Sequence, residues 1–152
     1  MKNSSVDGRV RTAGQDHLTR IHRYVGLGAS VVFALVGLAF LLLPGQVVNL
    51  FNLLSLHVGL PPAPEHSAGL YDILAGAYMY LVTVLAFGIY REPHNPVYSS
   101  FLISAKAASA VLSILFFALD HPYLIFLTNA VVDGSIAGGF LTLRILLKRG
   151  RA

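Results

Sequence analysis

Long stretches without a charged residue alternate along the chain with short polar or proline-containing segments. The first stretch, residues 25–43, contains 19 residues and no charge. Roughly 20 apolar residues in a helix, at about 1.5 Å each, cross the ~30 Å hydrocarbon layer of a bilayer. The pattern predicts four spanning segments, at about residues 21–43, 68–90, 97–119 and 122–147. Because backbone groups in lipid must be satisfied internally and these segments are too long for barrel strands, we expect four helices.

The links between the predicted spans differ in length. About six residues join spans two and three, and two or three residues join spans three and four, so we expect a four-helix bundle of antiparallel neighbours. The first half of the longer link, residues 44–67, has polar residues at intervals of three. This spacing predicts a short interfacial helix, with an irregular loop as the alternative. Residues 1–15 are polar and predict a mobile cytoplasmic tail, which leaves residues 16–152 as one membrane domain.

Composition supports a membrane protein. Hydrophobic residues make up 55% of the chain and charged residues 12%, and the mean hydropathy is +0.68. A soluble domain carries about 25% charged residues. The calculated pI of 9.6 comes from basic residues that flank the apolar segments, so membrane topology explains it and we expect no nucleic-acid partner. The chain has no cysteine, which excludes disulfides and thiolate chemistry.

The basic residues define an orientation. Apart from Lys106, they precede span one, lie between spans two and three, or lie at the end of span four: Lys2, Arg9, Arg11, Arg20, Arg23, Arg91, Arg144, Lys148, Arg149 and Arg151. The positive-inside rule therefore predicts that both termini and the 91–96 loop are cytoplasmic. We expect an integral protein of a bacterial inner membrane.

Two charged residues fall deep inside the predicted spans, Lys106 in the third and Asp133 in the fourth. Lys106 precedes the tight turn by about 14 residues and Asp133 follows it by about 12, so in antiparallel helices their depths differ by about 3 Å. An isolated charge in mid-membrane costs on the order of 3 kcal/mol, and pairing offsets much of that cost. The sequence therefore predicts an intramembrane Lys106–Asp133 ion pair.

Further polar residues are expected to support this pair. Asn129 and Arg144 share the helix face of Asp133, and Asp72, with Thr83, lies on one stripe of span two. Three roles for the pair remain open: fixing the register of the helices, acting as a proton relay or substrate site, or facing separate partner subunits.

Small residues recur at intervals of four in the same spans. Ala130, Gly134 and Gly138 form one such series, Ser135 precedes Gly139 by four residues, and Gly76 lies in span two. Small-xxx-small spacing lets membrane helices approach closely. The series therefore predicts helix packing within the bundle, contact with another protein, or both.

No cofactor or metal is expected. Histidine and carboxylate residues gather in the outer links at His57, Glu65, His66, Asp72, Asp120 and His121, but their spacing matches no metal motif. The stretch IHRYVGLG, residues 21–28, resembles the His-Arg-x-x-Gly stretch that opens the first membrane helix of succinate dehydrogenase cytochrome b subunits. The downstream haem-ligand histidine expected within a membrane helix of that family is missing from this chain, so the resemblance assigns no haem or quinone residue.

Phosphate loops, dinucleotide fingerprints, nucleophile elbows and metalloprotease helix motifs are absent from the sequence. This favours a non-catalytic accessory or structural subunit that lies in the lipid bilayer and packs against a larger membrane complex or against other copies of itself. Two alternatives stay open. One is a small transporter or proton-coupled carrier that uses Lys106 and Asp133. The other is a small membrane oxidoreductase that acts on a lipid-soluble substrate.

Overall fold

The computed structural model of the chain describes the backbone of residues 4–64 and 70–149 and the side chains of residues 16–64 and 73–149. Within these ranges the chain is helical and has no strand. The helices are α1 (Ser4–Leu42), α2 (Pro44–Val58), α3 (Leu70–Arg91), α4 (Pro96–Leu119) and α5 (Leu124–Arg149). Four of them, α1, α3, α4 and α5, are long and apolar enough to cross a membrane. The prediction of an all-helical chain with four such segments is confirmed.

Two helix starts differ from the prediction. Helix α1 begins at Ser4, so helical conformation extends through most of the segment that was expected to be a tail. Extending an existing helix fixes one residue for each hydrogen bond gained and needs no new nucleus. The mobility of residues 1–15 stays a prediction. Helix α5 begins at Leu124 rather than Pro122, because the Tyr123 N–H donates to the His121 carbonyl in a tight turn (2.8 Å) before the helix starts.

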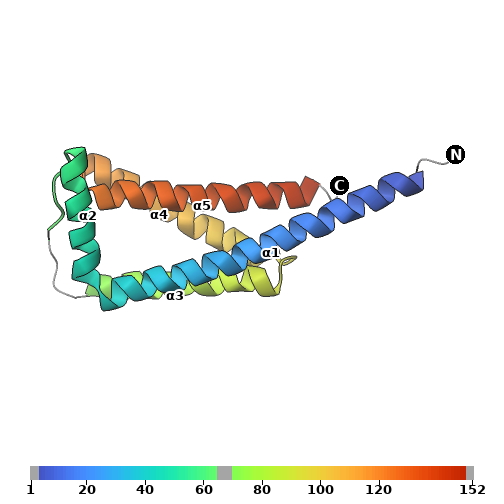
Figure 1. Cartoon of the computed structure of the whole chain (residues 1–152), viewed down its shortest axis with the longest axis horizontal. Coiled ribbons are helices and arrows are strands. Elements are labelled where there is room, and N and C mark those ends of the chain that lie inside the picture. The colour runs from blue at the N-terminus through green and yellow to red at the C-terminus, as the bar shows by residue number, and fades with distance from the viewer. Residues whose placement is uncertain (1–3, 65–69, 150–152) are drawn as a thin grey trace.

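The short helix that was predicted between spans one and two exists as α2, which lies across the end of the bundle (Figure 1). Pro44 occupies its first turn, and Gly59 ends it with a φ of 69°, a left-handed conformation that glycine adopts without a steric penalty. Asn52 then holds the following extended segment. Its Nδ2 donates to the Ala63 carbonyl (2.9 Å), and its Oδ1 accepts from the Ala63 N–H (2.7 Å).

The spanning helices associate mainly as two pairs, α1 with α3 and α4 with α5 (Figure 1). Helix α4 starts beside the end of α3 and crosses the molecule to reach α5. The Asn95 side chain caps this start, because its Oδ1 accepts from the Val97 N–H (3.1 Å), and Pro96 occupies the first turn. Both chain ends lie toward the same end of the molecule (Figure 1).

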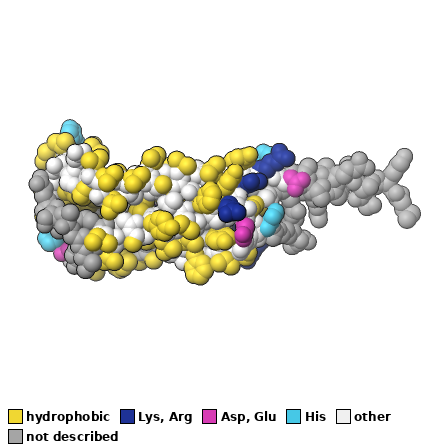
Figure 2. Space-filling model, turned by 90° about the horizontal axis from the view of Figure 1, so that it is seen from below, with side chains coloured by type: hydrophobic (Ala, Val, Ile, Leu, Met, Phe, Trp, Pro, Cys, Tyr) yellow, Lys and Arg dark blue, Asp and Glu magenta, His cyan; other side chains and the backbone are white. Residues whose placement is uncertain are grey.

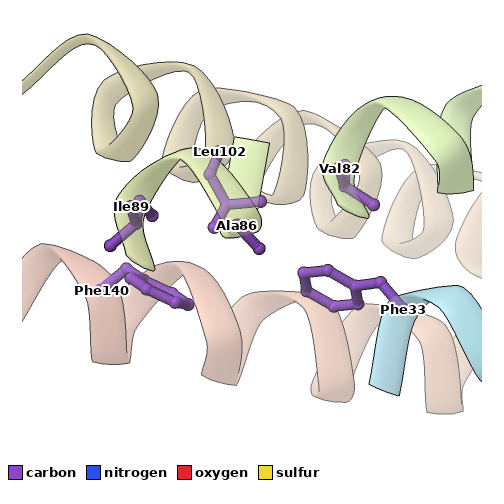
Figure 3. Close-up of a cluster of buried hydrophobic side chains, with 6 residues drawn as sticks. All are labelled: Phe33, Val82, Ala86, Ile89, Leu102 and Phe140. Atoms are coloured by element: carbon purple, nitrogen blue, oxygen red, sulfur yellow. The ribbon is translucent and has the colours of Figure 1, made fainter. Parts of the chain in front are cut away.

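The buried core lies where the two pairs cross (Figure 3). It takes residues from all four spanning helices: Phe33, Val82, Ala86, Ile89, Leu102 and Phe140. Large hydrophobic side chains elsewhere are extensively exposed along the helices. On the face drawn in Figure 2, lysine and arginine gather at the end near the termini, and hydrophobic side chains cover the length between the two ends.

Candidate functional site: a buried ion pair between four helices

Lys106 and Asp133 project toward each other from the middle of α4 and the middle of α5. The Lys106 Nζ atom lies 2.8 Å from Asp133 Oδ1, and each side chain is only 4% exposed. The tight link between α4 and α5 brings the two residues to one level, as the residue count on either side of the turn predicts. The predicted ion pair is therefore present.

Aromatic rings from the other helix pair complete the surroundings of the amine. Lys106 Nζ lies 4.6 Å from the ring centroid of Phe33 on α1 and 5.2 Å from that of Tyr78 on α3. Both distances allow cation–π attraction, which is stronger when the cation is desolvated. The Tyr78 hydroxyl donates to the Ala105 carbonyl (3.2 Å) and so is satisfied beside the pair. The three other long helices, α1, α3 and α5, thus each contribute a group around the Lys106 amine of α4.

The carboxylate of Asp133 is only half satisfied. Its Oδ1 accepts from Lys106, whereas Oδ2 is buried and has no hydrogen-bond partner among the described residues. A buried acceptor without a partner costs about 1–3 kcal/mol. Chemically, Oδ2 is the atom of this site that can accept one further hydrogen bond or a proton.

Asn129 lies one helical turn before Asp133 but bonds to α4 rather than to the carboxylate. Its Nδ2 donates to Ser113 Oγ (2.7 Å) and to Ser109 Oγ (3.1 Å). The predicted supporting residue therefore forms a second polar contact between α4 and α5, nearer the turn that joins these helices.

A third polar contact was not found from the sequence. His22 on α1 is 2% exposed, and its Nε2 lies 3.1 Å from Ser99 Oγ on α4. The His22 ring also packs edge-on against Phe140, with ring centroids 6.2 Å apart. The available signal was spacing: His22 precedes the buried Phe33 by 11 residues, about three helical turns, which puts both on one face of α1.

The other predicted polar residues do not join the pair. Thr83 Oγ1 donates to the Met79 carbonyl of its own helix (2.7 Å). Arg144 is half-buried at the end of α5, and its Nε is buried without a partner among the described residues. The side chain of Asp72 lies outside the described residues.

The predicted helix-packing positions divide into two groups. Ala130 is buried, a Cβ on Gly134 would lie 3.8 Å from Ala110 Cβ, and a Cβ on Gly76 would lie 3.5 Å from Leu41 Cδ1. These are ordinary contacts inside the chain. In contrast, Gly138 and Gly139 are exposed, and a Cβ on either would meet no atom within 4 Å. Whether these two glycines contact another molecule stays a prediction.

Potential metal ligands are dispersed in the part of the chain that the structure describes, where no three histidine or acidic side chains come together. The neighbouring Asp120 and His121 form an exposed contact of 2.8 Å between Oδ1 and Nδ1. Glu65 and His66 lie outside the described residues.

No protein-family model matches this chain, and searches of curated proteins and of solved structures found no match. Its function is therefore inferred from its own residues.

Proposed function

We propose that this chain is a non-catalytic accessory subunit of a bacterial inner membrane, which packs against a larger integral membrane complex or against copies of itself. In this proposal the four long helices form an antiparallel transmembrane bundle, with both termini and the 91–96 loop in the cytoplasm. The gathering of lysine and arginine at the end near the termini supports this orientation (Figure 2).

The observation that carries the proposal is the open glycine face of α5. Gly134 and Gly138 are four residues apart and exposed: a Cβ on Gly134 would meet only Ala110 Cβ, at 3.8 Å, and a Cβ on Gly138 would meet no described atom within 4 Å. Hydrophobic burial does not drive association between helices in lipid, so packing is gained where small residues let two backbones approach. A partner helix can lie closely against α5 at these two glycines.

The buried ion pair supports the same role. Lys106 and Asp133 neutralise each other inside the bundle, and their side chains contribute almost nothing to its surface. A pair that breaks when helices separate favours one arrangement of α4 and α5, as buried ionic groups do in some proteins. The chain can then present a constant apolar surface to a partner.

Native mass analysis after extraction in a mild detergent tests the proposal. We expect the wild-type chain in a complex heavier than one chain, and we expect Gly138→Leu to release it. Gly28→Leu is the matched control, because Gly28 is also exposed on a spanning helix and has no neighbour within 4 Å of a built Cβ. A wild-type chain that is always a lone monomer would contradict the proposal, as would equal release by both variants.

A proton-coupled carrier is the second candidate, and the unpartnered Oδ2 of Asp133 favours it. Four helices are few for a monomeric carrier, so this function requires an oligomer. The test is pH-driven flux into proteoliposomes with wild type and with Asp133→Asn, which keeps the shape of the side chain but carries no titratable proton. Flux that is lost only in Asp133→Asn supports a carrier; unaltered flux, or none in either protein, removes this candidate.

A further inference from the structure

Two hollows follow each other along α1: the first is lined by α1 alone, and the second lies in the seam between α1 and α5. The first lies near the basic end of the bundle and includes His17, Arg20 and Tyr24 in its lining. The second lies between the two helices, has a volume of about 320 Å³, and is lined only by apolar residues and glycine, including Ala29, Val32, Ile136, Gly139 and Leu143. Val25 lines both hollows, so the two hollows adjoin at this residue.

Two arginines near the basic end of this seam, Arg20 and Arg144, take part in no ion pair among the described residues. Arg20 lines the first hollow, and Arg144 directly follows Leu143, which lines the second. Neither guanidinium forms an ion pair with a carboxylate of the described residues, and Arg144 Nε is buried without a partner. Arg23, by contrast, lies over the Tyr90 ring at 4.7 Å from its centroid. The apolar hollow in the seam therefore adjoins a hollow that contains Arg20, and Arg144 follows a residue of its lining.

We propose that this seam binds one anionic phospholipid of the leaflet at the basic end. The guanidinium groups of Arg20 and Arg144 hold the phosphate, and one acyl chain lies in the apolar hollow between α1 and α5. Guanidinium groups bind phosphate with paired hydrogen bonds, and basic sites between membrane helices on the cytoplasmic side accept anionic headgroups.

The length of the hollow fits an acyl chain. The lining of α1 runs from Val25 to Phe33, about 12 Å of helix. One turn further, Val36 and Val132 line the next hollow, of about 580 Å³, which lies toward α2. A single leaflet contributes about 15 Å of hydrocarbon, half of the ~30 Å layer, so a chain anchored at the arginines can follow the seam to the middle of the membrane. A free phosphate ion would leave this apolar lining unused.

The proposal requires that the chain is in a membrane, but it does not require a partner subunit. It is tested on chains reconstituted with equal amounts of phosphatidylglycerol and phosphatidylcholine, extracted in a mild detergent and weighed by native mass spectrometry. We expect the wild-type chain to retain one phosphatidylglycerol per chain, several-fold more often than phosphatidylcholine. Equal retention of the two lipids by the wild-type chain would overturn the proposal.

The headgroup contact is tested by Arg20→Gln combined with Arg144→Gln, which we expect to bring the two lipids close to equal retention. Arg91→Gln is the control, because Arg91 is an exposed arginine at the end of α3 and lines neither hollow. It should keep the preference. Excess inorganic phosphate should not displace the lipid, and displacement would assign the arginines to a soluble anion instead.

The acyl-chain contact is tested by two neighbouring glycines. Gly139 lines the apolar hollow and Gly138 does not, yet a Cβ on either meets no atom within 4 Å, so both tolerate a larger side chain. We expect Gly139→Leu to lose the retained phosphatidylglycerol and Gly138→Leu to keep it. This comparison stays decisive if the double arginine variant does not fold. Retention by Gly139→Leu at the wild-type level would overturn the proposal.

The variants Gly138→Leu and Gly139→Leu also distinguish this lipid site from the proposed subunit role. Gly138→Leu should release a partner chain and keep the lipid, whereas Gly139→Leu should lose the lipid and keep the partner. A protein that proves monomeric but still selects phosphatidylglycerol would refute the subunit role alone.

Discussion

The two closely packed helix pairs hold together by different means. Where α1 meets α3, glycines remove the side chain between the helices: a Cβ on Gly26 would lie 3.0 Å from the Ala86 carbonyl oxygen, and a Cβ on Gly37 only 2.8 Å from Met79 Cβ. Where α4 meets α5, polar side chains join the helices, above all the pair of Lys106 and Asp133 at 2.8 Å.

The difference corresponds to the two ways in which helices associate in lipid, where burial from water does not drive them together, and our proposal places both helix pairs in a bilayer. One is close backbone approach, which gains dispersion contacts, and the other is hydrogen bonding between groups that lipid cannot solvate. A contact made by close backbone approach tolerates no added methyl group. A contact made by hydrogen bonds tolerates changes in side-chain size but not the loss of one bonding partner.

The largest expected effect comes from removing half of the ion pair. Asp133→Ala or Lys106→Ala leaves a buried charge without its partner, and we expect each to lower the free energy of unfolding by about 3–5 kcal/mol. Lys106→Leu combined with Asp133→Leu removes both charges and should recover most of that loss. Unfolding by titration with a denaturing detergent, followed by circular dichroism, measures all of these changes.

With Lys106→Leu and Asp133→Leu as the single variants, the double variant completes a double-mutant cycle that checks whether the pair acts as a unit. If the losses of the two single variants simply add in the double variant, Lys106 and Asp133 do not stabilise each other. The polar contact between α4 and α5 would then contribute no interaction energy that distinguishes it from the glycine contact between α1 and α3.

The next effect concerns the glycine contact. Gly26→Ala and Gly37→Ala force a methyl group into the α1–α3 interface, and we expect each to cost about 1–3 kcal/mol, as overpacking does. The matched control is Gly28→Ala on the same helix, where a Cβ meets no atom within 4 Å. That variant should be neutral or gain a few tenths of a kcal/mol, because alanine favours the helix over glycine. Equal costs at all three positions would show that close approach of α1 to α3 does not set the result.

These two interfaces also show what the sequence can predict. The number and type of the spans follow from the length of the apolar runs, because the bilayer sets one length for every span. The Lys106–Asp133 pair follows from counting residues on either side of a tight turn, since the rise of a helix is constant. Both inferences use one helix or one hairpin, so no knowledge of distant packing is needed.

Contacts between distant helices could not be predicted in the same way. The glycines that α1 uses against α3, Gly26 and Gly37, are of the same residue type as the open Gly138 and Gly139, and spacing alone does not say which face meets a neighbour. The contact of His22 with Ser99 depends on how α1 is rotated relative to α4. That rotation is set by the packing of all four helices, which no local pattern in the sequence encodes.

A smaller effect is expected at the second polar contact between α4 and α5. Asn129→Ala removes the two hydrogen bonds to Ser109 and Ser113, at 3.1 and 2.7 Å. Hydrogen bonds between membrane helices average about 0.6 kcal/mol each, so we expect a loss of about 1 kcal/mol. The same detergent titration measures it, with Thr83→Ala as the control because Thr83 bonds only within its own helix. A loss as large as that of Asp133→Ala would show that Asn129, rather than the ion pair, is the main link between α4 and α5.

The smallest effect is expected where α5 presents glycine to open space. Neither Gly138→Ala nor Gly139→Ala places its new methyl group against an atom of the chain, so the free energy of unfolding of the isolated monomer should stay within about 0.5 kcal/mol of wild type. The measurement uses monomer that has been stripped of lipid, so that a bound lipid or partner does not contribute. A loss above about 1 kcal/mol, the range assigned to Gly26→Ala and Gly37→Ala, would mean that this face of α5 packs inside the chain. Both helix pairs would then rely on glycine contacts, and the division between them would disappear.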